Sequence, residues 1–239
     1  MKRCLNAKES IRKKVQQWNR LMEIKKMKKI AIIGAGGFGK EVFCIWKDML
    51  ESKKEIYDFI GYFDDNEDLA ENTYGPVRGK IEELNTINEP IEVAIALGNT
   101  HHLKVIREKI SNHNISFPNI IHPSVKFLDI NTILLGEGNI FSLNVILSCD
   151  IKLGSFNIFN TRATLGHDVK VGNYNIFSPN AQISGMVTIG NQNYFGFNCG
   201  VIQCKNIGNL NTVGAGAILL RSIENEGTYI GVPAKKLIF

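Results

Sequence analysis

The chain has 239 residues, enough for two modest domains, and its 44% hydrophobic and 21% charged residues are ordinary for a globular protein. No apolar run approaches the about 18 residues that a membrane-spanning helix needs, and the basic N-terminus lacks the apolar core of a secretory signal. Five cysteines without a CxxC pair favour reduced thiols in the cytoplasm over a disulfide framework or a zinc site.

The positive charge of the chain is concentrated in its N-terminal leader. Residues 1–29 hold eleven Lys or Arg against two Glu, whereas the remainder is mildly acidic. Ile11, Val15, Trp18 and Met22 recur at the spacing of one helix face, so a basic amphipathic helix could touch an anionic membrane surface. We favour instead an extension that precedes an internal methionine start. We expect no nucleic-acid binding, because no aromatic-rich basic patch occurs elsewhere.

The segment after the leader alternates between apolar runs and helical spacings. In chain order we expect a strand at 28–34, a helix at 40–50, strands at 58–63 and 91–97, a helix at 101–110 and a closing strand at 117–121. Such alternation implies a small parallel sheet with helices on its faces, which is an α/β domain of half-Rossmann-like type.

From residue 122 an internal repeat of eighteen residues begins. Glycines recur at this spacing, each after an aliphatic residue, at Gly136, Gly154, Gly172, Gly190 and Gly208. Apolar or small residues recur about every six, so each coil has three short sides that bury their inner faces by stacking. We expect Gly or Asn at the corners, where φ is positive. The chain thus divides into a leader (1–27), an α/β domain (28–121) and a parallel β-helix (122–239).

A glycine-rich loop links the first expected strand to the first helix. GAGGFG at 34–39 fits G-x-G-x-x-G, in which glycines let the backbone approach a phosphate at a helix N-terminus. Asp64 and Asp65 end the next strand, where an acidic residue can hold a ribose or a base edge. A nicotinamide enzyme is disfavoured, because the chain offers half of a dinucleotide fold and a β-helix in place of a hydride-transfer domain.

Six motifs occur in a characteristic order: KKIAIIGAGGFGKEV, GYFDDN, AIALGN, IIHPS, GHDVKVG and GVPAKKL. This ordered set, over roughly residues 28–237, resembles the hexapeptide-repeat sugar acetyltransferases, which include bacterial nucleotide-sugar N-acetyltransferases and sialic acid O-acetyltransferase-like proteins. The resemblance implies a left-handed β-helix and a homotrimer with active sites between subunits. It also implies acetyl-CoA as co-substrate and a role in the synthesis of a surface polysaccharide or glycan, while the cysteine pattern predicts no metal and a cytoplasmic location.

Matched motif by motif, the resemblance also assigns binding residues. It places the nucleotide sugar against Gly36, Gly37, Phe38, Asp64, Asp65 and Gly98. It places acetyl-CoA against Ile176, Phe197 and Ala215. Phe38 and Ile176 stand where several relatives have histidine.

His167 is the one histidine of the repeat and is followed by Asp168. Acetyl transfer needs a nucleophile that loses its proton as it attacks, and an imidazole that exchanges protons near neutral pH suits that role. The resemblance assigns His167 as the general base and Asp168 as the acid that orients and strengthens it. We expect the remaining histidines to be structural or solvated, and Cys199 to be a small core residue.

These assignments predict an acetyl-CoA-dependent N-acetyltransferase that acts on a nucleotide-linked amino sugar. Two alternatives stay open. One is O-acetylation of a sugar such as sialic acid, because amine and hydroxyl acceptors use the same base. The other is a non-catalytic nucleotide-sugar scaffold. For the enzyme, the glycine-rich segment 177–185 is the expected source of an N–H donor to the thioester oxygen.

Overall fold

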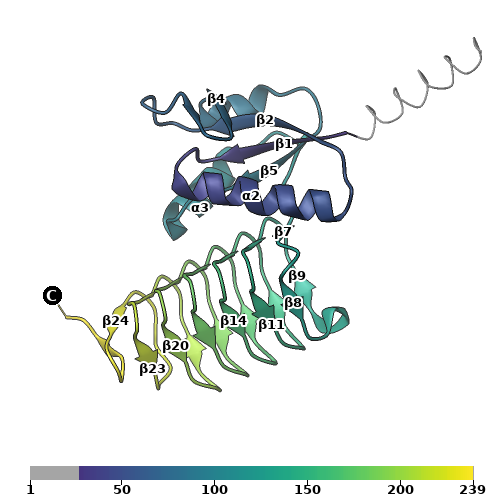
Figure 1. The fold of residues 1–239 in the computed structure, drawn as a ribbon. Helices are drawn as coiled ribbons and strands as arrows, with labels where there is room; N and C mark the ends of the chain where they lie inside the picture. The colour runs from purple at the N-terminus through teal and green to yellow at the C-terminus, as the bar shows by residue number, and fades with distance from the viewer. Residues whose placement is uncertain (1–26, 239) are drawn as a thin grey trace, which may run out of the picture.

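The computed structural model describes residues 27–238 as two stacked domains, an α/β domain resting on a β-helix (Figure 1). The amphipathic pattern at 11–22 lies outside the described residues. No helix in the described part of the chain is both long and apolar enough to cross a membrane.

The α/β domain is a six-stranded sheet in the order β3-β4-β2-β1-β5-β6, parallel except for β3. Its elements are β1 (Lys28–Ile33), α2 (Gly37–Ser52), β2 (Tyr57–Phe63), β3 (Glu71–Asn72), β4 (Gly75–Gly79), a 3-10 helix (Ile81–Thr86), β5 (Ile91–Ile95), α3 (Thr100–Lys109) and β6 (Ile115–Ser116). The central strand β1 buries its last four residues, and α2 buries Val42, Ile45, Trp46 and Met49, the spacing of one helix face.

The strands at 28–34, 58–63 and 91–97 and both helices are confirmed, whereas the closing strand at 117–121 is wrong. The sheet closes earlier, with β6, and β7 (Ile120–Ile121) pairs with a strand of the β-helix. Pro118 explains the break, because it has no N–H to continue a ladder. The strand within the apolar run at 117–121 therefore belongs to the β-helix, and the residues just before the run close the α/β sheet.

The β-helix has three parallel sheets, which we call sheets 1, 2 and 3. Sheet 1 comprises β7, β10 (Ile140–Phe141), β13 (Ile158–Phe159), β16 (Ile176–Phe177), β19 (Tyr194–Phe195), β22 (Thr212–Val213) and β24 (Thr228–Ile230), with β25 (Lys235–Lys236) antiparallel at its end. Sheet 2 comprises β8 (Lys126–Phe127), β11 (Ile146–Leu147), β14 (Thr164–Leu165), β17 (Gln182–Ile183), β20 (Gly200–Val201) and β23 (Ile218–Leu219). Sheet 3 comprises β9 (Leu134–Leu135), β12 (Lys152–Leu153), β15 (Lys170–Val171), β18 (Thr188–Ile189) and β21 (Asn206–Ile207).

Most corners of the coil are sharp and contain one residue of positive φ. We name them corner A (sheet 3 to sheet 1), corner B (sheet 1 to sheet 2) and corner C (sheet 2 to sheet 3). The residues are Gly138, Asn144, Asp150, Phe156, Arg162, Asp168, Tyr174, Asn180, Met186, Gln192, Asn198, Cys204, Leu210, Gly216 and Glu226. The expectation of Gly or Asn is therefore wrong at most corners. The left-handed conformation costs about 1–2 kcal/mol, and a hydrogen bond between coils offsets it, as from Phe156 N–H to Glu137 O (2.9 Å).

The repeated glycines and asparagines instead serve the stacking of coils. A Cβ at Gly154 would lie 2.6 Å from Gly172 O in the next coil, and the other glycines of the series are equally crowded. Five fully buried asparagines form a ladder through the coil: Asn139, Asn157, Asn175, Asn193 and Asn211. The Asn175 amide and backbone N–H both donate to Asn157 Oδ1, at 2.9 Å. Four stacked phenylalanines, Phe141, Phe159, Phe177 and Phe195, fill the centre.

The α/β domain covers part of the outer face of sheet 1. Ile140, Ile158 and Ile176 point out of the coil and share one apolar core with the α/β domain. The same column continues as Tyr194, which is 37% exposed, and Thr212, which is exposed. The change from isoleucine to polar residues marks where the cover ends.

Candidate active site

The first half of the candidate site lies at the carboxyl ends of β1, β2 and β5. Because the chain leaves β1 toward β2 and leaves β5 toward β6, the crevice between β1 and β5 is a topological switch point, where open α/β sheets bind ligands. The structure brings the predicted glycine loop, Asp64, Asp65 and Gly98 to this edge. Gly98 is exposed beside the N-terminus of α3.

The glycines of the loop fall into two groups. Gly34 has a φ of +99° and a Cβ there would lie 2.6 Å from Ala96 O, while a Cβ at Gly39 would collide with the Gly34 carbonyl. These two glycines are required by the fold. A Cβ at Gly36 or Gly37 would meet nothing within 4 Å. The N-terminus of α2 therefore opens into free space, with no side-chain cap on its N–H groups, as an anion site requires.

Of the other residues predicted at this edge, Asp64 holds the glycine loop and Asp65 holds the start of the 3-10 helix. Asp64 accepts a hydrogen bond from Ala35 N–H at 2.7 Å, and Asp65 accepts one from Ile81 N–H at 3.0 Å. Phe38 is half-buried and packs against the core of the domain. The exposed Asp65 carboxylate remains the more accessible of the two acids.

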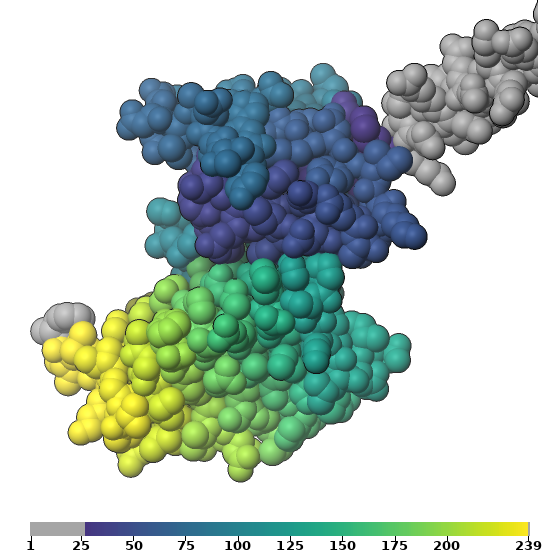
Figure 2. Space-filling model, viewed as in Figure 1, coloured from purple at the N-terminus to yellow at the C-terminus, as the bar shows by residue number. Residues whose placement is uncertain are grey.

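A cleft of about 700 Å³ continues from this edge along α2 to corner B of the β-helix. Its wall includes Lys40, Glu41 and Tyr74 from the α/β domain and Ser142 and Thr161 from the coil. A hydrogen bond that the Tyr74 hydroxyl donates to the Cys44 side chain is the main cause that raises the pKa of Tyr74, so the hydroxyl stays protonated. The cleft lies in the seam where the two domains meet, and Figure 2 shows that seam from one side. Sequence reasoning missed these residues, although the helical spacing of Gly37, Lys40, Glu41 and Cys44 could have indicated one face.

The second half of the candidate site is at corner C. His167 Nδ1 lies 2.7 Å from Asp168 Oδ2, and both side chains are about half exposed, at 53% and 56%. Asp168 is the positive-φ residue of this corner, and its backbone N–H bonds to Cys149 O in the preceding coil. The coil thereby fixes the backbone from which the carboxylate projects, and a proton on Nδ1 leaves Nε2 free as an acceptor.

Gly185, eighteen residues after His167, occupies the same corner in the next coil. It ends the segment 177–185, and its backbone N–H has no hydrogen-bond partner among residues 27–238. The eighteen-residue period could have identified Gly185 from the sequence, because the period determines which residue of the next coil lies beside His167.

The two halves lie apart within one chain. The α/β domain packs on sheet 1, and in a triangular coil corner C is the apex opposite that sheet. His167 therefore faces away from the glycine loop and from the cleft of its own chain.

Of the residues predicted to contact acetyl-CoA, the structure brings two together. Phe197, which is 51% exposed, and Ala215, also exposed, lie on successive coils at corner B. Ile176 is only 3% exposed and packs under the α/β domain, apart from both. His122, in contrast, lies 3.2 Å from Asp48 of α2 and ties the two domains together.

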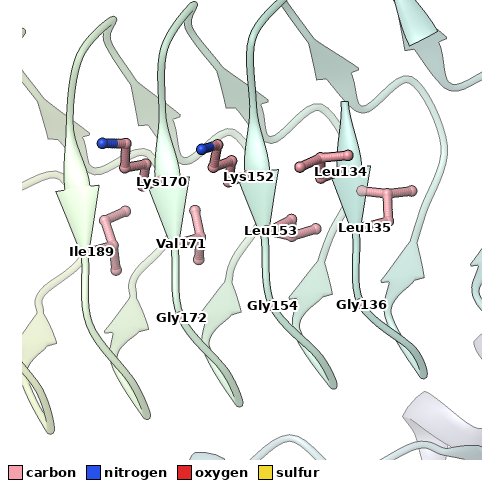
Figure 3. Close-up of a pocket in the computed structure, with 10 residues that line it drawn as sticks. All are labelled: Leu134, Leu135, Gly136, Lys152, Leu153, Gly154, Lys170, Val171, Gly172 and Ile189. Atoms are coloured by element: carbon pink, nitrogen blue, oxygen red, sulfur yellow. The ribbon is translucent and has the colours of Figure 1, made fainter. Parts of the chain in front are cut away.

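A shallower groove of about 450 Å³ lies on the outer face of sheet 3. Figure 3 shows Lys152 and Lys170 extending side by side from neighbouring coils, above a row of glycines. The groove contains no acid or imidazole, so it offers no base for acyl transfer. Within the described residues, no cluster of three or more His, Cys, Asp or Glu could hold a metal ion.

Residues 29–112 match the family described as the PglD N-terminal domain. Among solved structures, the acetyltransferase domain of PglB from Neisseria gonorrhoeae FA1090, in complex with acetyl coenzyme A, is 29% identical over 88% of this chain and 100% of that chain, with a TM-score of 0.78. PerB from Caulobacter crescentus, in complex with CoA and GDP-perosamine, is 28% identical over 87% and 97%, with a TM-score of 0.76. WeeI from Acinetobacter baumannii AYE, at 23% identity over 88% and 100% and a TM-score of 0.73, shares the fold. No curated protein matches significantly.

These matches confirm the expected fold class, a half-Rossmann-like domain followed by a left-handed parallel β-helix. They also confirm the resemblance drawn from the sequence motifs and the class of enzyme that it implied. The expected co-substrate agrees with the acetyl-CoA or CoA bound in two of these relatives.

Proposed function

From the premise that the chain has the architecture of a hexapeptide-repeat sugar acetyltransferase, we propose that it transfers the acetyl group of acetyl-CoA to the amine of a nucleotide-linked amino sugar. The observation that carries the proposal is the His167–Asp168 pair, 2.7 Å apart and exposed, which leaves Nε2 free to act as a base. The product would serve the synthesis of a surface polysaccharide or glycan. The free thiols of the chain suit a cytoplasmic enzyme.

In the proposed reaction, the sugar nitrogen attacks the thioester carbon while His167 Nε2 takes a proton from that nitrogen. A C–N bond forms and the C–S bond breaks. The imidazolium then returns the proton to the sulfur, so that free CoA leaves as a thiol. Asp168 is a positioning residue, because its hydrogen bond to Nδ1 fixes the tautomer that keeps Nε2 unprotonated. The N–H of Gly185, which has no partner among residues 27–238, would donate to the developing oxyanion.

The glycine loop supplies the nucleotide site in this proposal. The diphosphate would accept hydrogen bonds from the open N-terminus of α2 at Gly36 and Gly37, and Asp65 would meet the ribose or the base. The sugar would then extend into the cleft toward Ser142 and Thr161.

The separation of the two halves supports a homotrimer with active sites between subunits. If parallel β-helices assemble around a three-fold axis with sheet 2 facing that axis, corner C of one copy would lie beside corner B of the next. Along corner B, Thr161 lies on the coil that holds His167, and Phe197 lies two coils later. The nucleotide sugar and acetyl-CoA would thus approach from opposite ends and meet at the neighbouring copy's His167.

The direct test is release of CoA thiol from acetyl-CoA with UDP-, GDP- and dTDP-linked 4-amino sugars and with free sialic acid, beside His167→Ala. Turnover of one amino sugar that is lost in the variant supports the proposal. Turnover of sialic acid alone moves the reaction to O-acetylation, and turnover that survives His167→Ala removes the assigned base. Silence across the panel, together with no acetyl-CoA binding by calorimetry, favours a nucleotide-sugar scaffold.

A further inference from the structure

The imidazole of His167 lies over the place where a side chain of Gly185 would be. A Cβ built on Gly185 would stand 2.5 Å from His167 Nε2, 2.7 Å from Cε1 and 2.9 Å from Cδ2. Real Cβ atoms essentially never approach another heavy atom so closely. The ring can keep this position only because residue 185 has no side chain.

Backbone conformation does not explain this glycine. Gly185 is absent from the positive-φ positions, which at this corner belong to Asp168 and Met186. Its nearest obstacles are atoms of the His167 ring, the mobile end of a side chain. Gly166 differs, because a Cβ there would lie 2.5 Å from the backbone nitrogen of Gly185 and 2.8 Å from Ser184 C. Gly166 is required by the stacking of coils, whereas the three atoms nearest to a Cβ on Gly185 all belong to the imidazole.

We infer that Gly185 is a positioning residue for His167, through the space that its missing side chain leaves open. In this open space, which we call the Gly185 slot, the ring can point Nδ1 at Asp168 and Nε2 at the next coil. The coils beyond it carry Phe197 and Ala215. A methyl group in the slot would rotate the ring away and break the Nδ1 hydrogen bond, yet it would leave the backbone N–H in place. The inference rests on the proposed role of His167 as the base.

The experiment compares Gly185→Ala with the wild-type full chain and with Gly200→Ala. In the control, the new Cβ would lie 2.9 Å from Ile218 Cδ1, the flexible tip of that side chain. Gly200 lies in sheet 2, and no histidine atom is within 4 Å of this Cβ. Three quantities are measured: the thermal unfolding midpoint, the imidazole ¹⁵N spectrum of His167, assigned by its loss in His167→Ala, and kcat with both KM values. We expect Gly185→Ala to unfold like the control, to lose the spectral signature of the Nδ1 hydrogen bond, and to lower kcat about 100-fold with KM nearly unchanged.

A second variant separates this role from general damage. If Gly185→Ala and Asp168→Asn both act by misplacing the ring, their effects on kcat will be far from additive in the double variant. Wild-type spectrum and kcat in Gly185→Ala, or loss of the fold, would overturn the inference. Turnover that survives His167→Ala would overturn the proposed function instead, while the ring spectrum would still report whether Gly185 places the imidazole.

Discussion

The two halves of the candidate site are built in opposite ways. At the edge of the α/β sheet, the proposed ligand would meet backbone, because Gly36 and Gly37 leave N–H groups open and Asp64 holds the loop. At corner C, the proposed chemistry would depend on two side chains, which project from a backbone turn that neighbouring coils repeat. A site of the first kind is tied to the fold of its loop, whereas a site of the second kind can be altered without disturbing the coil.

The largest expected effect is at the side-chain half. His167→Ala should lower turnover by about 10²–10⁴-fold, the usual contribution of a general base. The unfolding temperature and the affinity for the nucleotide should stay at their wild-type values, because the exposed ring supports neither. Steady-state kinetics measures turnover, and calorimetry with UDP, GDP and dTDP measures nucleotide affinity. Thermal unfolding measures the unfolding temperature. A parallel loss of nucleotide affinity would show that the halves are not separate within the chain.

At the backbone half, two glycine variants should behave differently. Gly36→Leu places a side chain in the open space before α2, so nucleotide affinity should fall at least about 10-fold with little change in stability. Gly39→Ala should instead destabilise the domain, since its Cβ collides with the backbone of Gly34. Calorimetry and chemical unfolding distinguish the two. Equal stability losses would contradict the division of the loop into open and packed glycines.

The coil that presents His167 depends on its buried asparagine ladder. Asn175→Ala would leave the backbone and side-chain donors of Asn193 without their acceptor in the core, at a cost of about 3 kcal/mol or more in the free energy of unfolding. Asn191→Ala, in the exposed outer ladder, should cost about 0.5–1.5 kcal/mol, because water replaces the lost bonds. Urea unfolding measures both. Similar costs would mean that burial does not set the strength of the ladder.

The smallest effect is expected at Cys199. Burial raises the pKa of this thiol from 9.0 to about 12. The unfolded chain therefore loses this proton first, and the stability that the neutral thiol contributes below pH 9 is lost progressively between pH 9 and 12. Cys199→Ala should remove that pH dependence and change stability by about 1 kcal/mol or less near neutral pH, since Ala163, Ala181 and Ala217 fill the same column. Native alkylation at pH 8 should modify the exposed Cys204 and spare Cys199.

Much of the fold follows from local sequence patterns. The apolar run at 28–34 and the helical spacing after Gly39 predict β1 and α2, and the eighteen-residue period predicts the coil. The corners do not follow, because residues such as Phe156 and Arg162 take positive φ through hydrogen bonds to another coil. Such support is invisible in a short window of sequence. We expected the asparagines at corners because a short window of sequence does not show bonds between coils, and most asparagine side chains in fact make such bonds.

The residues of the candidate site were only partly predictable. Motifs placed His167 beside Asp168 and put Gly36 at an open loop, because these are local features. A motif match gives the position of a residue along the repeat but does not show whether another domain covers that position. Ile176 and Phe197 were therefore both predicted to contact acetyl-CoA, although Ile176 is buried and Phe197 is exposed. The column of outward-facing isoleucines could have shown this difference, because it extends only as far as the α/β domain covers the coil and is replaced by Tyr194 beyond that point.

The central claim is that one active site takes its glycine loop from one chain and its histidine from another. Co-expression of His167→Ala with Gly36→Leu tests it, because each variant alone lacks one half. Random mixing in trimers should restore about one quarter of wild-type turnover, since each restored site needs an intact loop beside an intact neighbouring histidine. Mixed oligomers that remain as inactive as either variant alone would contradict the account and place both halves within one chain.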